Sequence, residues 1–334
     1  MLAAILRAYD TPLVIAEIPQ PEPRPGEVLV KVSACGVCGS DRFLQKGGFQ
    51  STLPIVPGHE ASGVVAGGTV AAFPIGTRVA LYYLRHCGQC RYCRTGRENV
   101  CRSVQRMGVD FNGAMAEYVT LPAANLVPIP ATVNDISAAV VTDSLGTPLH
   151  ALRMAEAKAG DVVLVIGIGG IGSSAIQIAK LLGARAIAAS RSEAAAEVAD
   201  AMGADDFVRC DAGLPRRVKE MTQGLGADIV LQCAPSQEAF VWGAEALATA
   251  GRLVVVATAL EPVPINTNSL LWGEQRLCGS RGFTRPDVVQ ALSWVEQGRL
   301  NVDHLTRTVL PLSQANQALA NLDRPDVVRS VLRP

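Results

Sequence analysis

The sequence predicts an α/β protein in which a β-rich, barrel-like domain is followed by a doubly wound parallel sheet. Short apolar or alternating runs, separated by proline and glycine, fill the first third of the chain and are typical of short antiparallel strands. From about Ser137 onward, alanine-rich helical segments alternate with Val/Ile strands, which is the pattern of a parallel sheet covered by helices. We therefore expect one domain at residues 1–144, a second at 145–284 and a return to the first at 285–334.

Each predicted element rests on a short run of residues. In the first domain the predicted strands are Glu27–Val32, Gly63–Val65 and Arg78–Tyr82. In the second domain we expect strands at Val162–Gly167, Ala186–Ala189, Ile229–Cys233 and Leu253–Ala257, and helices at Ile171–Leu182 and Ser192–Met202. A helix at Pro286–Gln297 and an apolar tail that needs a sheet to join end the chain.

Composition and charge narrow the functional class. The chain has 334 residues, of which 49% are hydrophobic and only 18% charged, as in a well-buried globular enzyme. Lys+Arg and Asp+Glu are equal at 30 each, so no net charge attracts the protein to nucleic acid or an anionic membrane, and we expect a small-molecule partner. Residues 1–10 lack the features of a signal peptide, and the apolar run 162–171 is too short and glycine-rich to span a bilayer. We expect a cytoplasmic protein.

Four cysteines lie close together in a glycine-rich, basic segment at residues 86–102. Cys87, Cys90, Cys93 and Cys101 have the spacing C-x2-C-x2-C-x7-C. Two-residue gaps let successive thiolates converge on one tetrahedral cation, and four sulfurs close its coordination shell, so we expect a structural zinc site. The spacing also fits an iron–sulfur cluster or a pair of disulfides, but nine cysteines without a secretory signal favour a reducing compartment.

A glycine-rich turn follows the first strand of the second domain. In the run DVVLVIGIGGIG, Gly167, Gly169 and Gly172 form the pattern G-x-G-x-x-G, with Gly170 and Ile171 between them. The first glycine permits a tight turn, the second lets the backbone approach a pyrophosphate, and the third lets helix and strand pack closely. Since strand, turn and helix are all present in register, we expect a dinucleotide-binding site.

The end of the next strand discriminates NAD from NADP. An acidic residue about 20 positions beyond the motif would accept hydrogen bonds from the adenosine ribose, but the chain has Ser190, Arg191 and Ser192 there. With no carboxylate at this strand end, we expect the serine hydroxyls and the guanidinium to favour the 2′-phosphate of NADP(H). The alternative is that Arg191 is an ordinary solvated side chain and Ser190 replaces the acid of an NAD site.

A second candidate metal site lies in the β-rich domain. Cys38 in CGVCGSD and His59 in GHEASG could begin a catalytic zinc site, which needs three protein ligands and an open position. Together with the cysteine segment and GIGGIG, these motifs occur in the order and at separations compatible with the zinc-dependent medium-chain alcohol dehydrogenases, and the chain resembles that family over essentially its whole length. The resemblance implies a GroES-like catalytic domain, a Rossmann domain, and one structural and one catalytic zinc ion.

The resemblance also implies roles for individual residues. Cys38 and His59 match catalytic zinc ligands, and Glu60 matches a carboxylate that approaches the metal during ligand exchange. Asp143 is the expected third ligand, with His150 as the weaker alternative; many family members have cysteine there, whereas bacterial and archaeal relatives with a similar D-x-x-x-T-P stretch use aspartate.

Four further residues match family positions around the reacting groups. Ser40 matches the hydroxyl that passes the alcohol proton outward, and Asp41 the carboxylate that orients a ligand histidine. Thr147 matches a residue that packs on the nicotinamide, and Arg329 an arginine that reaches the cofactor pyrophosphate. A histidine usually follows the serine by three residues, but Phe43 stands there, so the proton must leave through the ribose and water or directly to solvent.

The resemblance implies hydride transfer between a nicotinamide cofactor and an alcohol/carbonyl pair. Tyr83 matches a pocket-lining aromatic position, and Phe43 and Phe49 add apolar wall, which suggests a medium-sized apolar or aromatic secondary alcohol, aldehyde or ketone. The alternative is that these three aromatic residues belong to the general core. The alternatives are a polyol dehydrogenase of the same family, a zinc-free quinone reductase of related fold, and a catalytically inactive relative with a binding or structural role. We expect a homodimer or homotetramer.

Overall fold

A computed structural model describes residues 1–68, 70–258, 262–324 and 327–334. It divides into two compact units, which are described separately below. The first unit comprises Met1–Gly146 and Thr284–Pro334, and the second comprises Thr147–Phe283.

The first unit is built on a mostly antiparallel sheet with the strand order β16-β17-β3-β4-β5-β9, in which β8 also pairs with β3. Its strands are β3 (Glu27–Val37), β4 (Glu60–Gly67), β5 (Arg78–Leu81), β8 (Tyr118–Pro122), β9 (Leu126–Pro128), β16 (Thr308–Pro311) and β17 (Ser330–Arg333). The pairs β1–β2 (Leu2–Ile5, Val14–Glu17) and β6–β7 (Leu84–Arg85, Gln105–Arg106) form two small ribbons.

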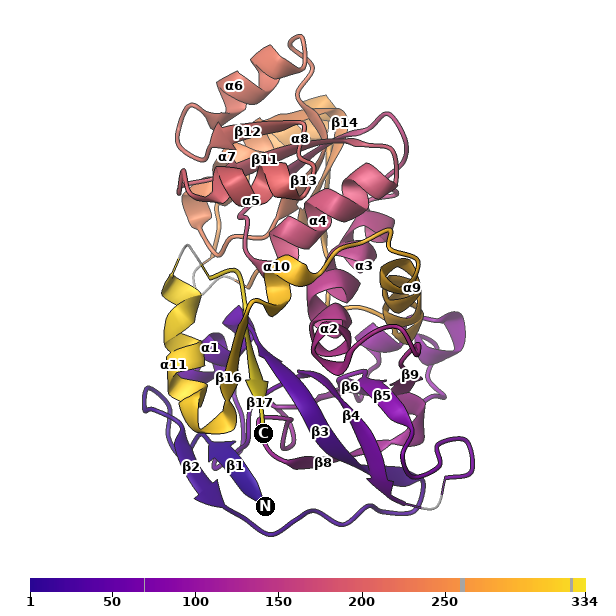
Figure 1. The fold of residues 1–334 in the computed structure, drawn as a ribbon. Coiled ribbons are helices and arrows are strands. Elements are labelled where there is room, and N and C mark those ends of the chain that lie inside the picture. The colour runs from indigo at the N-terminus through magenta and orange to yellow at the C-terminus, as the bar shows by residue number, and fades with distance from the viewer. Residues whose placement is uncertain (69, 259–261, 325–326) are drawn as a thin grey trace. The chain divides into compact units, whose positions relative to one another are not determined.

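The C-terminal tail completes this sheet. Strand β17 pairs antiparallel with β3, with Leu332 opposite Cys35, and parallel with β16 (Figure 1). Apolar side chains of β3, β4 and β5 point into a core that also receives Leu332 from β17. The tail residues Ser330–Leu332 are therefore buried next to the strand that leads to Cys38, as the apolar tail indicated.

Short helices complete the first unit. They are α1 (Gly39–Gln45), α2 (Asp135–Val140), α9 (Arg285–Glu296), α10 (Asp303–Thr306) and α11 (Ala315–Ala320). Asn134 caps the N-terminus of helix α2, because its side chain accepts a hydrogen bond from the backbone N–H of Ser137. It is followed by a π-helical turn, Val141–Leu145, which brings Asp143 toward the sheet.

The second unit has an all-parallel sheet with the strand order β12-β11-β10-β13-β14-β15. The strands are β10 (Val162–Ile166), β11 (Arg185–Ser190), β12 (Asp206–Arg209), β13 (Ala227–Gln232), β14 (Leu247–Val255) and β15 (Arg276–Gly279). The helices are α3 (Gly146–Met154), α4 (Gly170–Leu181), α5 (Ala195–Ala201), α6 (Leu214–Met221), α7 (Gln237–Glu245) and α8 (Thr267–Gly273).

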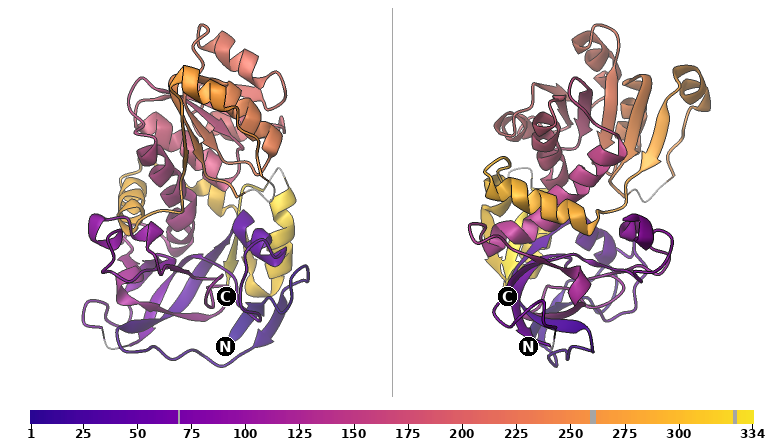
Figure 2. Two further views of the ribbon diagram at one scale, coloured as in Figure 1. Left: turned by 180° about the vertical axis from the view of Figure 1, so that it is seen from behind. Right: turned by 90° about the vertical axis from the view of Figure 1, so that its right-hand side faces the viewer.

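The strand order reverses at β10. The chain adds β11 and β12 on one side of β10 and then β13, β14 and β15 on the other. Because parallel crossovers are right-handed, connections that run in opposite directions place their helices on opposite faces, as the side view in Figure 2 shows. The carboxyl ends of β10, β11 and β13 therefore meet at the reversal point, where open α/β sheets bind ligands. The predicted two-part α/β architecture is confirmed.

The largest boundary differences are at two strands: β14 begins at Leu247 rather than at the predicted Leu253, and β3 continues to Val37 rather than ending at Val32. One helix is also shorter than predicted. The segment predicted as helix from Ser192 to Met202 is helical only from Ala195 to Ala201, because the residues after Ser190 first turn away from the end of β11. Among the residues that the structure describes, no helix is long and apolar enough to cross a membrane.

Candidate active site and metal centres

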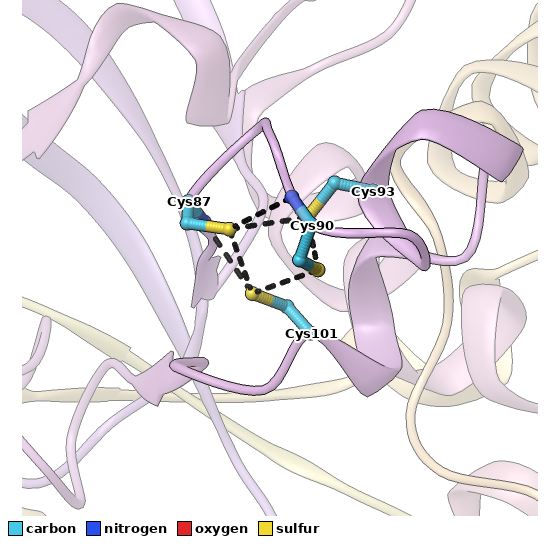
Figure 3. Close-up of side chains that lie close together, drawn as sticks. All are labelled: Cys87, Cys90, Cys93 and Cys101. Atoms are coloured by element: carbon cyan, nitrogen blue, oxygen red, sulfur yellow. Dashed lines mark hydrogen bonds between the residues drawn. The ribbon is translucent and has the colours of Figure 1, made fainter.

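The four cysteines converge at one point in the first unit. Figure 3 shows the side chains of Cys87, Cys90, Cys93 and Cys101 facing one another, with sulfur–sulfur separations between 3.5 and 3.9 Å. A tetrahedral zinc with Zn–S bonds of about 2.3 Å requires ligand separations of about 3.8 Å, so the donor set fits this metal. The thiols are free rather than paired in disulfides.

Backbone groups prepare two of these sulfurs for a cation. Backbone N–H groups of Gln89 and Cys90 lower the pKa of the Cys87 thiol, and those of Cys93 and Arg102 lower the pKa of Cys90 to about 6. Hydrogen bonds of this kind favour the thiolate, which is the form that binds metal.

A second group of possible metal ligands is buried in the same unit. Cys38, His59, Glu60 and Asp143 each offer one ligand atom, and these atoms lie within 4.8 Å of one another. The Sγ of Cys38 is 3.6 Å from Oδ2 of Asp143, again the edge of a tetrahedron around a zinc-sized ion. Among the described residues, His150 is not part of the group.

The group draws its side chains from three places in the fold. Cys38 is the N-cap of α1 and directly follows β3, while His59 directly precedes β4. Asp143 comes from the π-helical turn after α2. The π-helical turn widens the helix locally, a feature that is common at functional sites.

Asp41 holds two of these connections together. Its Oδ2 accepts the backbone N–H of Cys38 at 2.8 Å, and its Oδ1 accepts that of Gly58 at 3.2 Å. The same Oδ1 lies 3.3 Å from Nδ1 of His59, which turns Nε2 toward Ser40, 3.2 Å away. A carboxylate that binds one ring nitrogen fixes the tautomer and orientation in which the other can bind a metal.

The charges of the group favour cation binding. Burial alone would lower the pKa of His59, but the Asp41 carboxylate and the Cys38 sulfur raise it well above its usual value. The pKa of Cys38 is lowered although burial and Asp143 oppose this, because the charges of Arg329 and His59 stabilise its thiolate. Anionic groups gathered in a buried site need a cation to balance them.

Glu60 is paired on one side only. Its Oε1 accepts a hydrogen bond from Nη1 of Arg329, and both side chains are buried. Its Oε2 is buried without a hydrogen-bond partner among the described residues, and one of the two carboxylate oxygens belongs to the metal-ligand group. A methyl group on Gly36 would lie 2.2 Å from this oxygen, so the glycine makes room for the carboxylate.

One aromatic side chain contacts this group, and two others pack together elsewhere in the same unit. The ring of Tyr83 lies 5.5 Å from that of His59, and Phe43 and Phe49 meet edge to face at 4.7 Å. Sequence reasoning overlooked Arg106, whose guanidinium carbon lies 4.7 Å from the centre of the Phe49 ring. We call Tyr83, Phe49, Phe43 and Arg106 the aromatic wall.

In the second unit, the glycine turn has the geometry that its motif requires. Gly167 has φ +94°, which favours glycine, and a methyl group on Gly172 would lie 1.8 Å from the carbonyl oxygen of Gly167. A methyl group on Gly169 would meet no atom within 4 Å, so its position is open. Gly170 and Ile171 begin α4, whose positive end faces the open side of the turn. The geometry of this turn therefore fits a dinucleotide pyrophosphate.

The charge of Arg191, which follows β11, is opposed by an acid from another element. Ser190 ends β11 and accepts the backbone N–H of Ser192, and Arg191 next to it is exposed. Sequence reasoning expected no acid here. The hydroxyl of Ser236 holds the pKa of Glu238 below its usual range, and the charge of Arg191 lowers it further. This acid from the first turn of α7 is near Arg191 in space although it lies far along the chain.

Three further predicted residues are each placed within one unit. Thr147 is buried in the first turn of α3, in the second unit, and His150 lies one turn later. Arg329 precedes β17 and is buried against Glu60 in the first unit.

Comparisons with known proteins agree with this architecture. Residues 24–131 match the family model described as alcohol dehydrogenase GroES-like domain, and residues 170–297 match zinc-binding dehydrogenase. An alcohol dehydrogenase of Geobacillus stearothermophilus is 33% identical over 308 residues, which cover 90% of each chain.

Solved structures are similar over the whole chain. The crystal structure of an NAD-dependent alcohol dehydrogenase has 32% identity and a TM-score of 0.91, with 100% of both chains covered. A zinc-binding dehydrogenase from Sinorhizobium meliloti 1021, bound to NADP, has 29% identity and a TM-score of 0.91, with 100% of this chain and 99% of the other covered. The chain belongs to the zinc-dependent medium-chain alcohol dehydrogenase family, as its motifs indicated.

Proposed function

We propose that the protein transfers hydride between NADP(H) and a medium-sized apolar or aromatic secondary alcohol, aldehyde or ketone. The observation that carries this proposal is the convergence of Cys38, His59 and Asp143 beside a buried, unpaired oxygen of Glu60. Three ligands of mixed type leave one position of a tetrahedral zinc open, which is the arrangement of a catalytic site. The aromatic wall next to His59 supports the choice of substrate.

Each residue of the site has a separate role in the proposed reaction. Bound zinc supplies a Lewis acid that lowers the pKa of an alcohol, and the nicotinamide supplies the hydride acceptor. Cys38, His59 and Asp143 bind the metal, and Asp41 orients His59. Ser40, 3.2 Å from Nε2 of His59, takes the proton of the substrate hydroxyl as it releases its own, so that it passes a proton outward. The phenyl ring of Phe43 cannot take up that proton. The proton therefore leaves through the ribose and water or directly to solvent.

A screen of alcohols and carbonyls with both cofactors tests the reaction. We expect turnover of aromatic or apolar secondary alcohols and of the matching ketones. Preferential oxidation of sugar alcohols would instead support the polyol dehydrogenase alternative. A metal-loaded protein that turns over no member of the panel would support a binding or structural role.

We expect two zinc ions per chain. The motivation is the two separate donor sets, each with the ligand separations of a tetrahedral site. Elemental analysis of protein purified without chelator should give a ratio of two, falling to one in Cys38→Ala. One zinc per chain that is unaffected by Cys38→Ala would contradict the catalytic-site proposal.

Cys93→Ser should damage the fold more than the chemistry. It removes one of four sulfurs from a site with no other described function, and structural zinc contributes to folding directly. We expect loss of the second zinc and a thermal transition lowered by roughly 5 °C or more. The protein that remains folded should keep its kcat, whereas a Cys38→Ala protein should not.

The cofactor preference follows from the end of β11. A 2′-phosphate would gain charge-assisted hydrogen bonds from Ser190 and Arg191, but Glu238 opposes it through space. We expect NADPH to be preferred over NADH by roughly 10-fold or more in kcat/KM. Glu238→Gln should increase this ratio, because it removes the opposing charge without changing the size of the side chain.

Steady-state kinetics with NADPH and with NADH measure the cofactor preference. Ser190→Asp combined with Arg191→Ala should reverse the preference, since a carboxylate accepts the ribose hydroxyls and repels the phosphate. A tenfold preference of the unmodified enzyme for NADH would mean that Arg191 points to solvent and that Ser190 replaces the acid of an NAD site.

We further propose that the protein is a cytoplasmic homodimer or homotetramer. Strand β15 ends the parallel sheet, and α8 leads to it with Leu271 67% and Trp272 82% exposed. An exposed sheet edge next to exposed apolar side chains is typical of a surface that associates. Sedimentation velocity should show a dimer or larger, which Trp272→Glu dissociates; a monomer at micromolar concentration would contradict the proposal.

A further inference from the structure

The aromatic wall ends at the guanidinium of Arg106, which forms a salt bridge with Asp110. Tyr83 lies beside His59, and its carbonyl oxygen accepts the backbone N–H of Met107 at 2.9 Å. Arg106, the residue before Met107, ends β7 opposite Leu84 of β6. The segment that carries Tyr83 away from the metal ligands therefore runs directly beside the segment that carries Arg106, within one unit.

Arg106 is held rigidly by Asp110. The backbone N–H and Nε of Arg106 donate to Oδ2 of Asp110 at 2.7 and 2.9 Å, and Nη2 donates to Oδ1 at 3.0 Å. The guanidinium also stacks on Phe49, which packs against Phe43. A surface arginine would usually sample many rotamers, but these contacts fix the plane of this one.

The contacts with Asp110 and Phe49 leave one edge of the Arg106 guanidinium available. Nη1 makes no hydrogen bond with any described residue, whereas Nε and Nη2 are occupied by Asp110. The side chain is 25% exposed, so Nη1 can reach a bound molecule without first losing a protein partner. A fixed cationic donor beside an aromatic surface is suited to a ring that carries an acceptor group.

We propose that Arg106 is a specificity-determining residue, which donates a hydrogen bond from Nη1 to a carboxylate or other acceptor at the end of the substrate remote from the reacting carbon. The substrate class is then an aryl ketone or alcohol with a polar acceptor group, rather than a purely apolar one. The inference rests on the proposed function, because it places the reacting carbon at the group of Cys38, His59 and Asp143.

The test compares acetophenone with 4-acetylbenzoate, which adds a carboxylate opposite the ketone. For the unmodified enzyme with two zinc ions and its preferred cofactor, we expect kcat/KM to be roughly 10- to 100-fold higher for 4-acetylbenzoate. Arg106→Met should bring the ratio close to one by raising KM for the carboxylate substrate alone. Arg106→Lys keeps the charge but not the fork geometry, so it should give an intermediate ratio.

Arg299→Met is the matched control. Arg299 also lies over an aromatic ring, that of Trp294 at 5.7 Å, but on α9 and the turn that follows it. We expect it to leave the ratio unchanged. An unmodified enzyme that does not favour 4-acetylbenzoate, or an Arg106→Met variant in which both substrates lose activity equally, would overturn the proposal.

Calorimetric binding separates this inference from the proposed function. The affinity for 4-acetylbenzoate and its loss in Arg106→Met can be measured in the metal-loaded protein without turnover. Tight, Arg106-dependent binding without reduction of either ketone would contradict the proposed reaction but not the role of Arg106. Reduction of acetophenone together with Arg106-independent binding of 4-acetylbenzoate would do the reverse.

Discussion

Asp143→Ala is expected to lower kcat/KM by at least about 10³-fold, since changes in groups that only support a metal ligand already cost 10- to 100-fold. Asp143 lies 3.6 Å from the sulfur of Cys38 in a buried group of donors. With its carboxylate removed, two strong ligands remain, and the zinc content should fall from two ions per chain to one. Binding of NADPH should stay within a few-fold, because the glycine turn is a separate site.

Three further variants make the result specific. Asp143→Cys should retain zinc and part of the activity, because thiolate is also a zinc ligand. Asp135→Ala is the matched control, since Asp135 is a carboxylate on the preceding helix that pairs with partly exposed Arg78. His150→Ala distinguishes the weaker alternative: full activity in Asp143→Ala together with loss of zinc in His150→Ala would move the ligand role to His150.

The sequence predicted those features that depend on local spacing. The four cysteines and the glycine turn each lie within a short run, so their geometry follows from the separation of their residues. The parallel sheet could also be predicted, because strands and helices alternate with clear apolar periodicity. The start of α5 was misjudged, since alanine-rich sequence favours helix before as well as after Ala195.

Contacts between segments that are distant along the chain could not be predicted from the sequence. Glu60 and Arg329 are 269 residues apart, and only the pairing of β17 with β3 brings their charges together. Glu238 was missed beside Arg191 because the first turn of α7 and the end of β11 meet only across the sheet. Arg106 was overlooked because its stacking on Phe49 depends on a loop conformation that no local pattern predicts.

The second large effect is expected at the glycine turn. Replacing Gly169 or Gly172 by alanine should weaken cofactor binding, but for different physical reasons. In Gly172→Ala the new methyl group would lie 1.8 Å from the backbone oxygen of Gly167, so the turn must deform even without cofactor. In Gly169→Ala the methyl group meets no protein atom within 4 Å and can only obstruct a bound molecule. Both variants should bind NADPH at least about 100-fold more weakly, a loss of roughly 2.7 kcal/mol.

Thermal unfolding without cofactor separates the two causes. We expect Gly172→Ala to lower the melting temperature by several degrees, whereas Gly169→Ala should leave it unchanged, and both should retain two zinc ions. Gly279→Ala is the control, because Gly279 lies on β15 with open space around it and should change neither quantity. NADPH binding is followed by the fluorescence of the nicotinamide. Unimpaired binding in Gly169→Ala would mean that the pyrophosphate does not approach the backbone at this turn, and the cofactor site would have to lie elsewhere on the sheet.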